Sequence, residues 1–477
     1  MLFSTPTFLF AFLPLLLAGY FLAPAATRNT VLVIASLVFY AWGETVYVLL
    51  ILLSALGNHC FALCIERKKP VNGARFWLTS AICFNLLMLV VFKYTNFIVA
   101  SLGAFLQHLE LPAIEPTSVH LPLGISFFTL QAISYIVDVY RRDVEAQRRF
   151  TNCLLYISLF PQLIAGPIVR YKHIAASITK RSVSADLFVS GVGRFSMGLG
   201  KKVLLADPLG HVADIAFATP VSDLTTPLVW LGAICFTLQI YFDFSGYSDM
   251  AIGMGRMFGF RFQENFNFPY IARSMREFWR RWHISLSTWF RDYLYIPLGG
   301  SRLGMARTYL NLFVVFLLCG IWHGAAWQFI VWGLFHGFFL ALERAGLERA
   351  VRATPRFFQH CYLLTLVVSS MVIFRAPTLS YGTSYLQAMY GFPPLAGGWQ
   401  DMIAILLAPD TLLALVIGIL LTTPIYRLTA AHIVARYADR HAVAIELVRL
   451  SGIAALLLLA ILAVVSTTYR PFIYFQF

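Results

Sequence analysis

Two histidines near the middle of the chain could do acid–base chemistry. His283 lies in the charged, aromatic segment FWRRWHISLSTWFRDYLYIPLGG, and His323 lies in the apolar segment NLFVVFLLCGIWHGAAWQFIVWGLFHG. An ionisable side chain is costly in such an apolar run unless it lines a wet cavity. A neutral imidazole, whose ordinary pKa is about 6.5, can accept a proton from a hydroxyl that attacks an activated acyl group. We therefore take His323 as the candidate catalytic base.

The neighbours of His323 leave two interpretations open. Gly324, Ala325 and Ala326 follow it, and such small side chains leave room for a substrate to approach. The alternative is a structural histidine that is hydrogen-bonded to a helix carbonyl, and this alternative applies equally to His283. His336, thirteen residues after His323, is expected to be a packing or interface residue.

Metal chemistry is not indicated near these histidines. The sequence around them has no His-x-x-x-His motif, no pair of carboxylates and no phosphate-binding loop, which argues against a metal enzyme or an ATPase. The seven cysteines lack the paired spacing of a zinc site, so we expect neither a metal site nor a disulfide framework.

Composition assigns the chain to the membrane. Of 477 residues, 59% are hydrophobic and 12% are charged, and the mean hydropathy is +0.74, whereas an ordinary soluble domain is roughly 25% charged. The 36 Lys and Arg against 22 Asp and Glu give a net charge of +14. Cytoplasmic loops of membrane proteins concentrate such cations, so the expected partner is the lipid bilayer and not nucleic acid.

Apolar runs of suitable length predict an all-α polytopic membrane protein with about 10–11 transmembrane helices. Basic flanks such as Arg67 and Arg141 belong in the cytoplasm, which places the N-terminus and the C-terminus outside. The predicted spans are residues 8–22, 30–42, 45–65, 76–98, 121–140, 185–206, 226–242, 357–376, 403–425 and 443–468.

Two further apolar runs have basic residues on both flanks and are interrupted. Residues 150–168 contain Pro161 and Gly166-Pro167, and residues 309–342 contain a turn signal at His323-Gly324. We expect both to enter and leave the membrane from the cytoplasmic side, which requires protein or water around the broken backbone. His323 would then lie partway through the membrane at the floor of a pocket open to the cytoplasm.

The segments outside these runs differ in charge. Residues 207–225 carry acidic residues but no Lys or Arg, and are expected to form an outer loop. Residues 243–307 interleave arginines with aromatic residues, which favours short intracellular helices in the membrane interface.

Several strings resemble the membrane-bound O-acyltransferase family, in the branch that includes the alginate O-acetylation protein. They are RRWHISLSTWFRDYLYIPLGGSR, GIWHGAAWQFIVWGLFHG, PLGISFFTLQAISYIVDVYR, PQLIAGPIVR and YFDFSGYSDMAIGMGRMFGF. The resemblance covers essentially the whole chain. It implies one membrane domain, 1–477, with N-terminal helices in 1–140, a catalytic core in 141–345 and C-terminal helices with an outer tail in 346–477.

The resemblance also implies a fold and a reaction. The fold is a ring of helices around a thinned centre with a funnel on each face. The reaction moves an acyl group from a cytoplasmic thioester donor, acetyl-CoA in acetylating members, to a cell-envelope polysaccharide outside the bacterial inner membrane. A periplasmic or membrane-anchored acyltransferase partner often completes the transfer, and no permanently bound cofactor is expected.

Roles for individual residues follow from this resemblance. His323 matches the membrane-embedded histidine, and His283 matches the second signature histidine, which orients substrate or stabilises the developing oxyanion. The arginines are expected to attract the phosphates of the donor; they are Arg280, Arg281 and Arg291. Asp243 and Ser245 are candidate polar walls of the pocket, and Asp292 is expected to neutralise a neighbouring arginine.

The C-terminal tail, YRPFIYFQF, allows two interpretations. Tails of this type in related acylation systems resemble carriers of a transient acyl-tyrosine, here Tyr474, that relays the group outward. The alternative is anchoring, because the aromatic residues around Tyr474 would settle into the bilayer interface.

Other functions remain open at this point. Cellulose, peptidoglycan or, with D-alanine as the acyl group, teichoic acid are alternative acceptors. Interrupted helices and a buried histidine are also typical of transporters, so transport of a lipid-linked sugar or an acyl donor is the alternative from another functional class.

Overall fold

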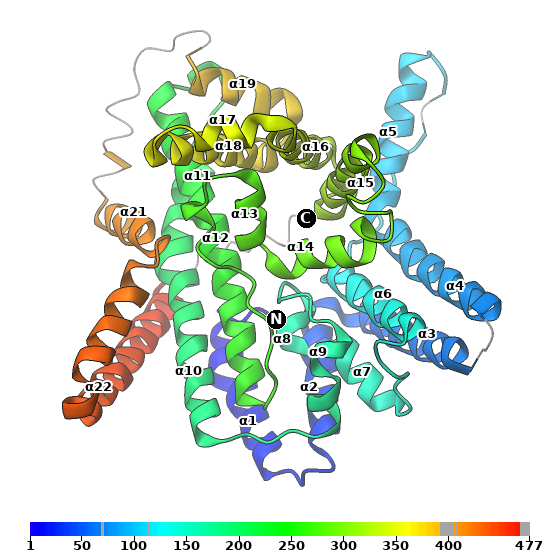
Figure 1. The fold of residues 1–477 in the computed structure, drawn as a ribbon, viewed down its shortest axis with the longest axis vertical. Helices are drawn as coiled ribbons and strands as arrows, with labels where there is room; N and C mark the ends of the chain where they lie inside the picture. The colour runs from blue at the N-terminus through cyan, green and yellow to red at the C-terminus, as the bar shows by residue number, and fades with distance from the viewer. Residues whose placement is uncertain (68–70, 113, 392–403, 406–407, 468–477) are drawn as a thin grey trace. The chain divides into compact units, whose positions relative to one another are not determined.

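The computed structural model describes residues 1–67, 71–112, 114–391, 404–405 and 408–467. Every regular element within these ranges is helical (Figure 1). Seven stretches in them are long and apolar enough to cross a membrane: Arg28–Arg67, Gly73–His108, Thr226–Met257, Met305–His323, Trp327–Arg352, Arg356–Arg375 and Arg440–Ser466. An eighth forms if the bent pair Pro409–Leu421 and Ile425–Tyr437 counts as one span. The prediction of an all-α polytopic membrane protein is confirmed.

The number of such stretches is lower than the predicted 10–11 because some predicted spans are joined or short. Arg28–Arg67 contains two of them, divided at Glu44, whose φ of −128° and ψ of 36° are not helical. The predicted run 8–22 forms the shorter apolar helix Phe8–Leu22. The run 121–140 forms a helix of 17 residues, Ile125–Arg141.

The chain divides into two compact units. The first comprises Met1–Val192 and Ala251–Gln263, and the second comprises Gly193–Met250 and Glu264–Phe477. The helices of the first unit are α1 (Leu13–Leu22), α2 (Arg28–Glu44), α3 (Val48–Arg67), α4 (Val71–Leu89), α5 (Thr95–His108), α6 (Ile125–Arg141), α7 (Phe150–Ser158), α8 (Phe160–Leu163) and α9 (Tyr171–Thr179).

The interrupted run 150–168 is broken in the structure, as predicted. α7 ends at Ser158, and Leu159, with φ −56° and ψ 109°, starts the short α8 in a new direction. Gly124 precedes α6 with a left-handed φ of 74°, and a Cβ on it would lie 2.5 Å from the carbonyl oxygen of Leu163. Only a glycine allows this approach, so the break is held by a close backbone contact.

The second unit contains both candidate histidines. Its helices are α11 (Asp207–Ala218), α13 (Met275–Arg281), α14 (Ile284–Phe290), α15 (Met305–His323), α16 (Trp327–Leu342), α17 (Glu348–Arg352), α18 (Arg356–Arg375), α19 (Leu379–Met389), α21 (Pro409–Leu421) and α22 (Ile425–Ser466). Two helices, α10 (Ala185–Gly200) and α12 (Thr226–Met257), contribute residues to both units.

Two predicted boundaries are wrong. Residues 207–218, expected in an outer loop, form α11, which continues from α10 through a π-helical turn at Lys201–Ala206. α12 runs on to Met257, although residues 243–257 were expected in the intracellular stretch. The polar side chains that lower the hydropathy there are buried in protein: Asp243, Ser245 and Ser248 are each 2% exposed or less. Burial against other helices, and not apolar composition, extends α12.

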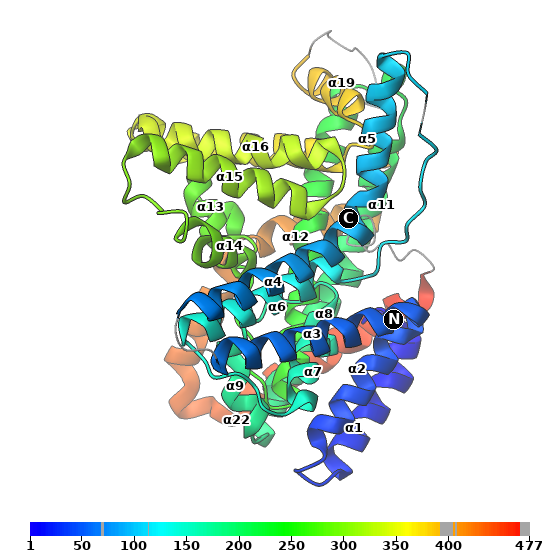
Figure 2. The same ribbon diagram turned by 90° about the vertical axis from the view of Figure 1, so that its right-hand side faces the viewer.

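The predicted hairpin at 309–342 is confirmed. α15 ends at His323, residues 324–326 are extended or turn, and α16 starts at Trp327. The two helices lie side by side (Figure 2). A Cβ on Gly320 would lie 2.4 Å from the carbonyl oxygen of Phe329 and 3.2 Å from the Cα of Gly333. These glycines therefore let the two backbones approach closely just before the turn that carries His323.

Candidate active site

His323 is the last residue of α15 and lies among aromatic rings. Its ring centroid is 4.9 Å from that of Trp322, 4.8 Å from that of Trp332 and 5.5 Å from that of Phe374. The residue is only 7% exposed. The expected open pocket is therefore not what the structure shows at this histidine, because packed rings enclose it.

The small residues after His323 do not leave free space, which corrects the expectation from the sequence. A Cβ on Gly324 would lie 2.1 Å from the ring of Phe329. Gly324 is small because that ring occupies the space beside it. A substrate can reach His323 from this side only if the Phe329 ring moves.

His336 belongs to the same aromatic cluster. Its ring lies 4.7 Å from that of Trp332 and 5.3 Å from that of Trp279, and its Nδ1 accepts a hydrogen bond of 3.3 Å from Trp279 Nε1. His336 is fully buried. These contacts fit the packing role that was expected for it.

His283 lies in a hydrogen-bonded network. It directly precedes α14 in a left-handed conformation, with φ 43° and ψ 54°, which is uncommon for a residue other than glycine. Its Nδ1 lies 3.2 Å from Asn265 Oδ1. The same oxygen accepts from the backbone N–H of Ser285 at 3.2 Å, and Asn265 Nδ2 donates to Ser248 Oγ at 3.1 Å. Asn265 could not be identified from the sequence, since nothing in its spacing links it to His283.

This network determines which nitrogen of His283 carries the proton. A backbone N–H can only donate, so the atom it bonds is the amide oxygen of Asn265. That oxygen can only accept, so His283 Nδ1 is protonated and Nε2 carries the lone pair. Nε2 is buried and has no hydrogen-bond partner in the described part of the chain. Burial lowers the pKa of His283 to about 3, so the ring is neutral at physiological pH.

A buried carboxylate, Glu343, ties the two histidine-bearing segments together. It follows α16 and accepts hydrogen bonds from the backbone N–H groups of Met275, at 2.6 Å, and Arg276, at 3.1 Å. These are the first two residues of α13, the helix that leads to His283. Glu343 also accepts from the Tyr362 hydroxyl at 3.3 Å. Glu343 could not be identified from the sequence, because the two N–H groups that it accepts from are 68 and 67 positions away along the chain.

The three candidate donor-binding arginines differ in their partners. Arg281 is engaged by Glu277 at 2.9 Å and by the carbonyl oxygen of Asn267 at 3.1 Å. Arg291 pairs with Asp292 at 2.6 Å, the neutralising role that was expected for Asp292. Arg280 is exposed and makes no ion pair with a described residue. Of the three, Arg280 is therefore the most available for an anionic ligand.

Asp243 and Ser245 lie on α12 but have different surroundings. Asp243 forms an ion pair of 3.0 Å with Lys202, which also pairs with Asp207 at 2.7 Å. All three side chains are at least nine-tenths buried. Lys202 was not identified from the sequence. It lies in the π-helical turn, where the extra residue per turn changes the direction of the following side chains, and its ammonium group contacts Asp243 on α12.

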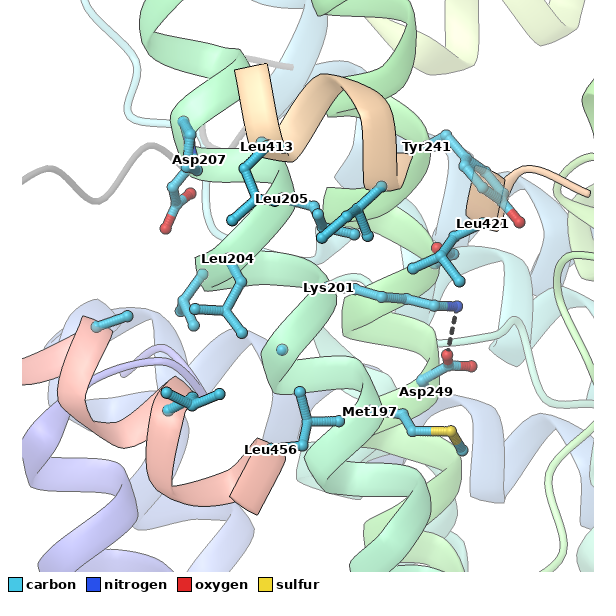
Figure 3. A pocket seen from close by; sticks show the side chains of 18 of the residues that line it. Met197, Lys201, Leu204, Leu205, Asp207, Tyr241, Asp249, Leu413, Leu421 and Leu456 are labelled. Atoms are coloured by element: carbon cyan, nitrogen blue, oxygen red, sulfur yellow. Dashed lines mark hydrogen bonds and ion pairs between the residues drawn. The ribbon is translucent and has the colours of Figure 1, made fainter. Parts of the chain in front are cut away.

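Ser245 lines a cavity of about 980 Å³ in the second unit (Figure 3). α10, the π-helical turn, α11 and α12 supply one part of its wall, and α21 and α22 supply another. Neither His283 nor His323 is among its lining residues. Tyr474 lies outside the described residues.

Comparison with known proteins identifies the family. Residues 38–385 match the family described as MBOAT, membrane-bound O-acyltransferase family. The chain is a membrane-bound O-acyltransferase. This O-acyltransferase is 46% identical over 400 residues to the probable alginate O-acetylase AlgI of Azotobacter vinelandii. The aligned region covers 84% of this chain and 79% of that protein.

Two further relatives match over a comparable share of the chain. The probable alginate O-acetylase AlgI of Pseudomonas aeruginosa is 46% identical over 404 residues, covering 84% of this chain and 76% of that protein. The peptidoglycan O-acetyltransferase of Helicobacter pylori is 37% identical over 432 residues, covering 82% and 80%. The O-acyltransferase described here is thus a multi-pass membrane enzyme, and the relatives reported above are named for the O-acetylation of alginate or peptidoglycan.

Proposed function

We propose that this O-acyltransferase takes an acetyl group from acetyl-CoA on the cytoplasmic side of the bacterial inner membrane and passes it outward for O-acetylation of an extracytoplasmic polysaccharide. The observation that supports this proposal best is the 46% identity, over 84% of the chain, to proteins named probable alginate O-acetylases. An alginate-type exopolysaccharide is therefore the favoured acceptor. Peptidoglycan is the second candidate, because a relative named for that acceptor is 37% identical.

In the proposed reaction His323 is the general base. It takes the proton from the attacking hydroxyl as the new C–O ester bond forms and the C–S bond of the thioester breaks. The thiolate of coenzyme A then leaves with that proton. The rings around His323 keep bulk water out, and the reaction requires the Phe329 ring to move so that the donor can approach.

The tautomer of His283 narrows its proposed role. A residue that stabilises an oxyanion must donate a hydrogen bond. The Nδ1–H of His283 is already directed at Asn265, and the neutral Nε2 can only accept. We therefore assign His283 the orientation of a substrate hydroxyl, which it binds through Nε2. Asn265 holds His283 in that tautomer, in the way a second group fixes a catalytic imidazole.

The proposed arrangement in the membrane follows the distribution of charge. The basic segments face the cytoplasm, where Arg280 attracts the phosphates of acetyl-CoA, and both termini lie outside. A periplasmic or membrane-anchored acyltransferase completes the transfer to the polysaccharide. Tyr474 is the proposed carrier if the acetyl group passes through a covalent relay.

The experiment that tests this function uses purified protein in sealed vesicles and acetyl-CoA labelled in the acetyl group. We expect the label to appear on protein or on added polysaccharide, and to disappear in the variant His323→Ala. His336→Gln is the matched control, because it changes another buried histidine of the same aromatic cluster and should retain transfer. Passage of intact acetyl-CoA into the vesicle, without transfer of label, would show a transporter instead.

A further inference from the structure

The proposed reaction needs a hydrogen-bond donor that His283 cannot supply. When a hydroxyl attacks the thioester, the carbonyl oxygen gains negative charge, and a donor placed at that oxygen lowers the energy of the transition state. The Nδ1–H of His283 is directed at Asn265, and its Nε2 can only accept. Another donor is therefore expected beside His323.

Trp332 lies directly beside His323. The centroids of the two rings are 4.8 Å apart, and the ring planes are inclined at 78°. Trp332 is on α16, in the hairpin whose turn carries His323, and it is only 2% exposed. The indole therefore packs against the proposed base from within the same pair of helices.

The indole N–H of Trp332 is buried and donates to no acceptor among the described residues. An indole nitrogen can only donate, and a buried tryptophan N–H usually finds a partner. Trp279 Nε1, in the same unit, donates to His336 at 3.3 Å. Trp230 Nε1 donates to the carbonyl oxygen of Met389 at 2.7 Å. Within the described part of the chain, Trp332 is the only tryptophan whose buried N–H has no acceptor.

This N–H requires an explanation, because a buried donor without a partner destabilises the folded protein. Phenylalanine would fill much of the same space without that cost. The tryptophan is explained if its acceptor arrives with the substrate.

The ring that has to move for catalysis is next to Trp332 on the helix. Phe329 occupies the space beside Gly324, and it precedes Trp332 by three residues, so both side chains project from the same face of α16. Both rings also contact Phe374, with centroids 5.1 Å and 5.2 Å from it. An acyl group that takes the place of the Phe329 ring therefore lies beside the indole of Trp332.

We propose, building on the function proposed above, that Trp332 is a catalytic residue whose Nε1–H donates a hydrogen bond to the thioester carbonyl oxygen. As the acceptor hydroxyl oxygen bonds to the carbonyl carbon, the π electrons of the C=O bond move to the carbonyl oxygen, and His323 takes the hydroxyl proton. The indole N–H stabilises the resulting oxyanion. When the C=O bond forms again, the C–S bond breaks and the thiolate leaves with the proton from His323.

The first test removes the donor from the purified full-length enzyme and measures acetyl transfer from acetyl-CoA. Trp332→Phe removes the N–H, and replacement of Trp332 by 3-benzothienylalanine, which has sulfur in place of N–H, removes it with almost no change of shape. Loss of one oxyanion donor typically lowers kcat about 10²–10³-fold, and we expect that loss in both variants. Because the contact is made in the transition state, kcat and kcat/KM should fall by the same factor. The thermal midpoint of the benzothienylalanine variant should not fall, since no hydrogen bond is removed.

Trp279→Phe is the matched control. It removes a buried indole N–H from the same aromatic cluster, where the rings of Trp279 and Trp332 are 5.9 Å apart, but this N–H is bonded to His336. We expect Trp279→Phe to lower the thermal midpoint and to leave kcat nearly unchanged.

The second test addresses the contact with the carbonyl oxygen itself. Dithioacetyl-CoA has sulfur in place of that oxygen, and sulfur is a weak hydrogen-bond acceptor. The donor N–H thus favours acetyl-CoA over dithioacetyl-CoA. The ratio of kcat for the two donors should fall by about tenfold or more in Trp332→Phe, whereas a purely structural role for Trp332 leaves the ratio unchanged.

Two results would overturn the assignment of Trp332. One is an undiminished kcat in the benzothienylalanine variant, and the other is an unchanged ratio for the two donors in Trp332→Phe. Both leave the proposed acyltransferase function intact if the unmodified enzyme transfers the acetyl group and His323→Ala does not. Absence of transfer by the unmodified enzyme, or full transfer by His323→Ala, would contradict the proposed function and the assignment of Trp332 with it.

Discussion

His283 and His323 lie in opposite kinds of surroundings within the same unit. His283 is bonded to an amide whose other contacts fix its orientation, so its tautomer and ring position are determined by hydrogen bonds. His323 stands at the turn of a helical hairpin with the rings of Trp322, Trp332 and Phe374 around it. The rings around His323 hold it by van der Waals packing. Because such contacts are not directional, a neighbouring ring can move and open a path to His323.

The different surroundings of His283 and His323 suit two different tasks in an acyl-transfer site. A residue that orients a substrate has to be rigid and to keep one protonation state. A residue that takes up and returns a proton has to be reachable when the substrate is bound and shielded from water otherwise. The surroundings of His283 suit the first task and those of His323 suit the second. Glu343 keeps the two segments in register through the start of α13.

The sharpest way to break this comparison is to exchange each histidine for glutamine. A lost general base typically costs about 10²–10⁴-fold in rate, so we expect His323→Gln to lower kcat for acetyl transfer by about a thousandfold. His283→Gln keeps a hydrogen-bonding side chain and should lower kcat less and raise KM for the acceptor. Steady-state kinetics on purified protein measures both. Equal losses of kcat in the two variants would contradict the division of roles.

Changing Asn265 sharpens the role of His283. Asn265→Ala removes the partner of Nδ1 and strands the hydroxyl and backbone N–H of Ser285. A buried group left without its hydrogen bond destabilises the folded protein by about 1–3 kcal/mol. We expect the same free energy to be lost from the positioning of His283, which corresponds to about a fivefold to 150-fold loss of activity. Asn265→Asp retains the acceptor but adds a negative charge, which raises the pKa of His283. The acid side of the pH–rate profile should then move to higher pH, a shift that a purely structural role for Asn265 does not produce.

The pH dependence of the free energy of unfolding tests whether His283 is buried as a neutral imidazole. The pKa of His283 is about 3 in the folded protein and about 6.5 when unfolded, so the unfolded chain binds the extra proton first. The associated stability is complete above pH 6.5 and is lost as the pH falls toward 3; at pH 5 the loss is about 2 kcal/mol. Denaturant titrations in detergent at pH 7 and pH 5 measure it. In His283→Gln, the difference in the free energy of unfolding between pH 7 and pH 5 should be smaller by about 2 kcal/mol. If that difference is the same as in the unchanged protein, His283 is not a neutral buried imidazole.

The smallest expected effect concerns the arginines just before His283. Arg280 is exposed without an ion-pair partner among the described residues, whereas Arg281 is held by Glu277 and Asn267. Exposed charge pairs contribute about 0.2–1 kcal/mol, so Arg280→Ala should raise KM for acetyl-CoA about two- to fivefold without changing kcat. Salt should reduce the effect by screening. Arg281→Ala serves as the comparison and should lower the thermal midpoint more than it changes KM.

Much of the architecture could be predicted where a local pattern decides it. The run 309–342 is too long and too rich in glycine for one helix, and the structure has α15 and α16 with their turn beside His323. The break in 150–168 follows in the same way from its prolines and Gly166. The extension of α12 beyond residue 242 was missed, because Asp243 and Asp249 look like loop residues until their partners on α10 and its π-helical turn are known.

In the candidate site, too, some features could be predicted from the local sequence and others depend on tertiary packing. The two histidines could be selected from the sequence, since an imidazole in an apolar or aromatic run is unusual enough to stand out. The enclosure of His323 could not, because Phe329 and Phe374 are placed against it by the hairpin and by α18. Small residues next to a histidine indicated open space, whereas the tertiary packing used that space for a ring.

By itself, the sequence determined that this protein is a helical membrane protein, where its chain is interrupted and which imidazoles could do chemistry, because hydropathy, length and glycine or proline positions act over one or two helical turns. Only the tertiary structure decided that Asn265 sets the tautomer of His283, that Lys202 lies between Asp207 and Asp243, and that α10 and α22 share a cavity. These features depend on side chains that are distant along the chain and meet only after the helices have packed. No local pattern carries that information.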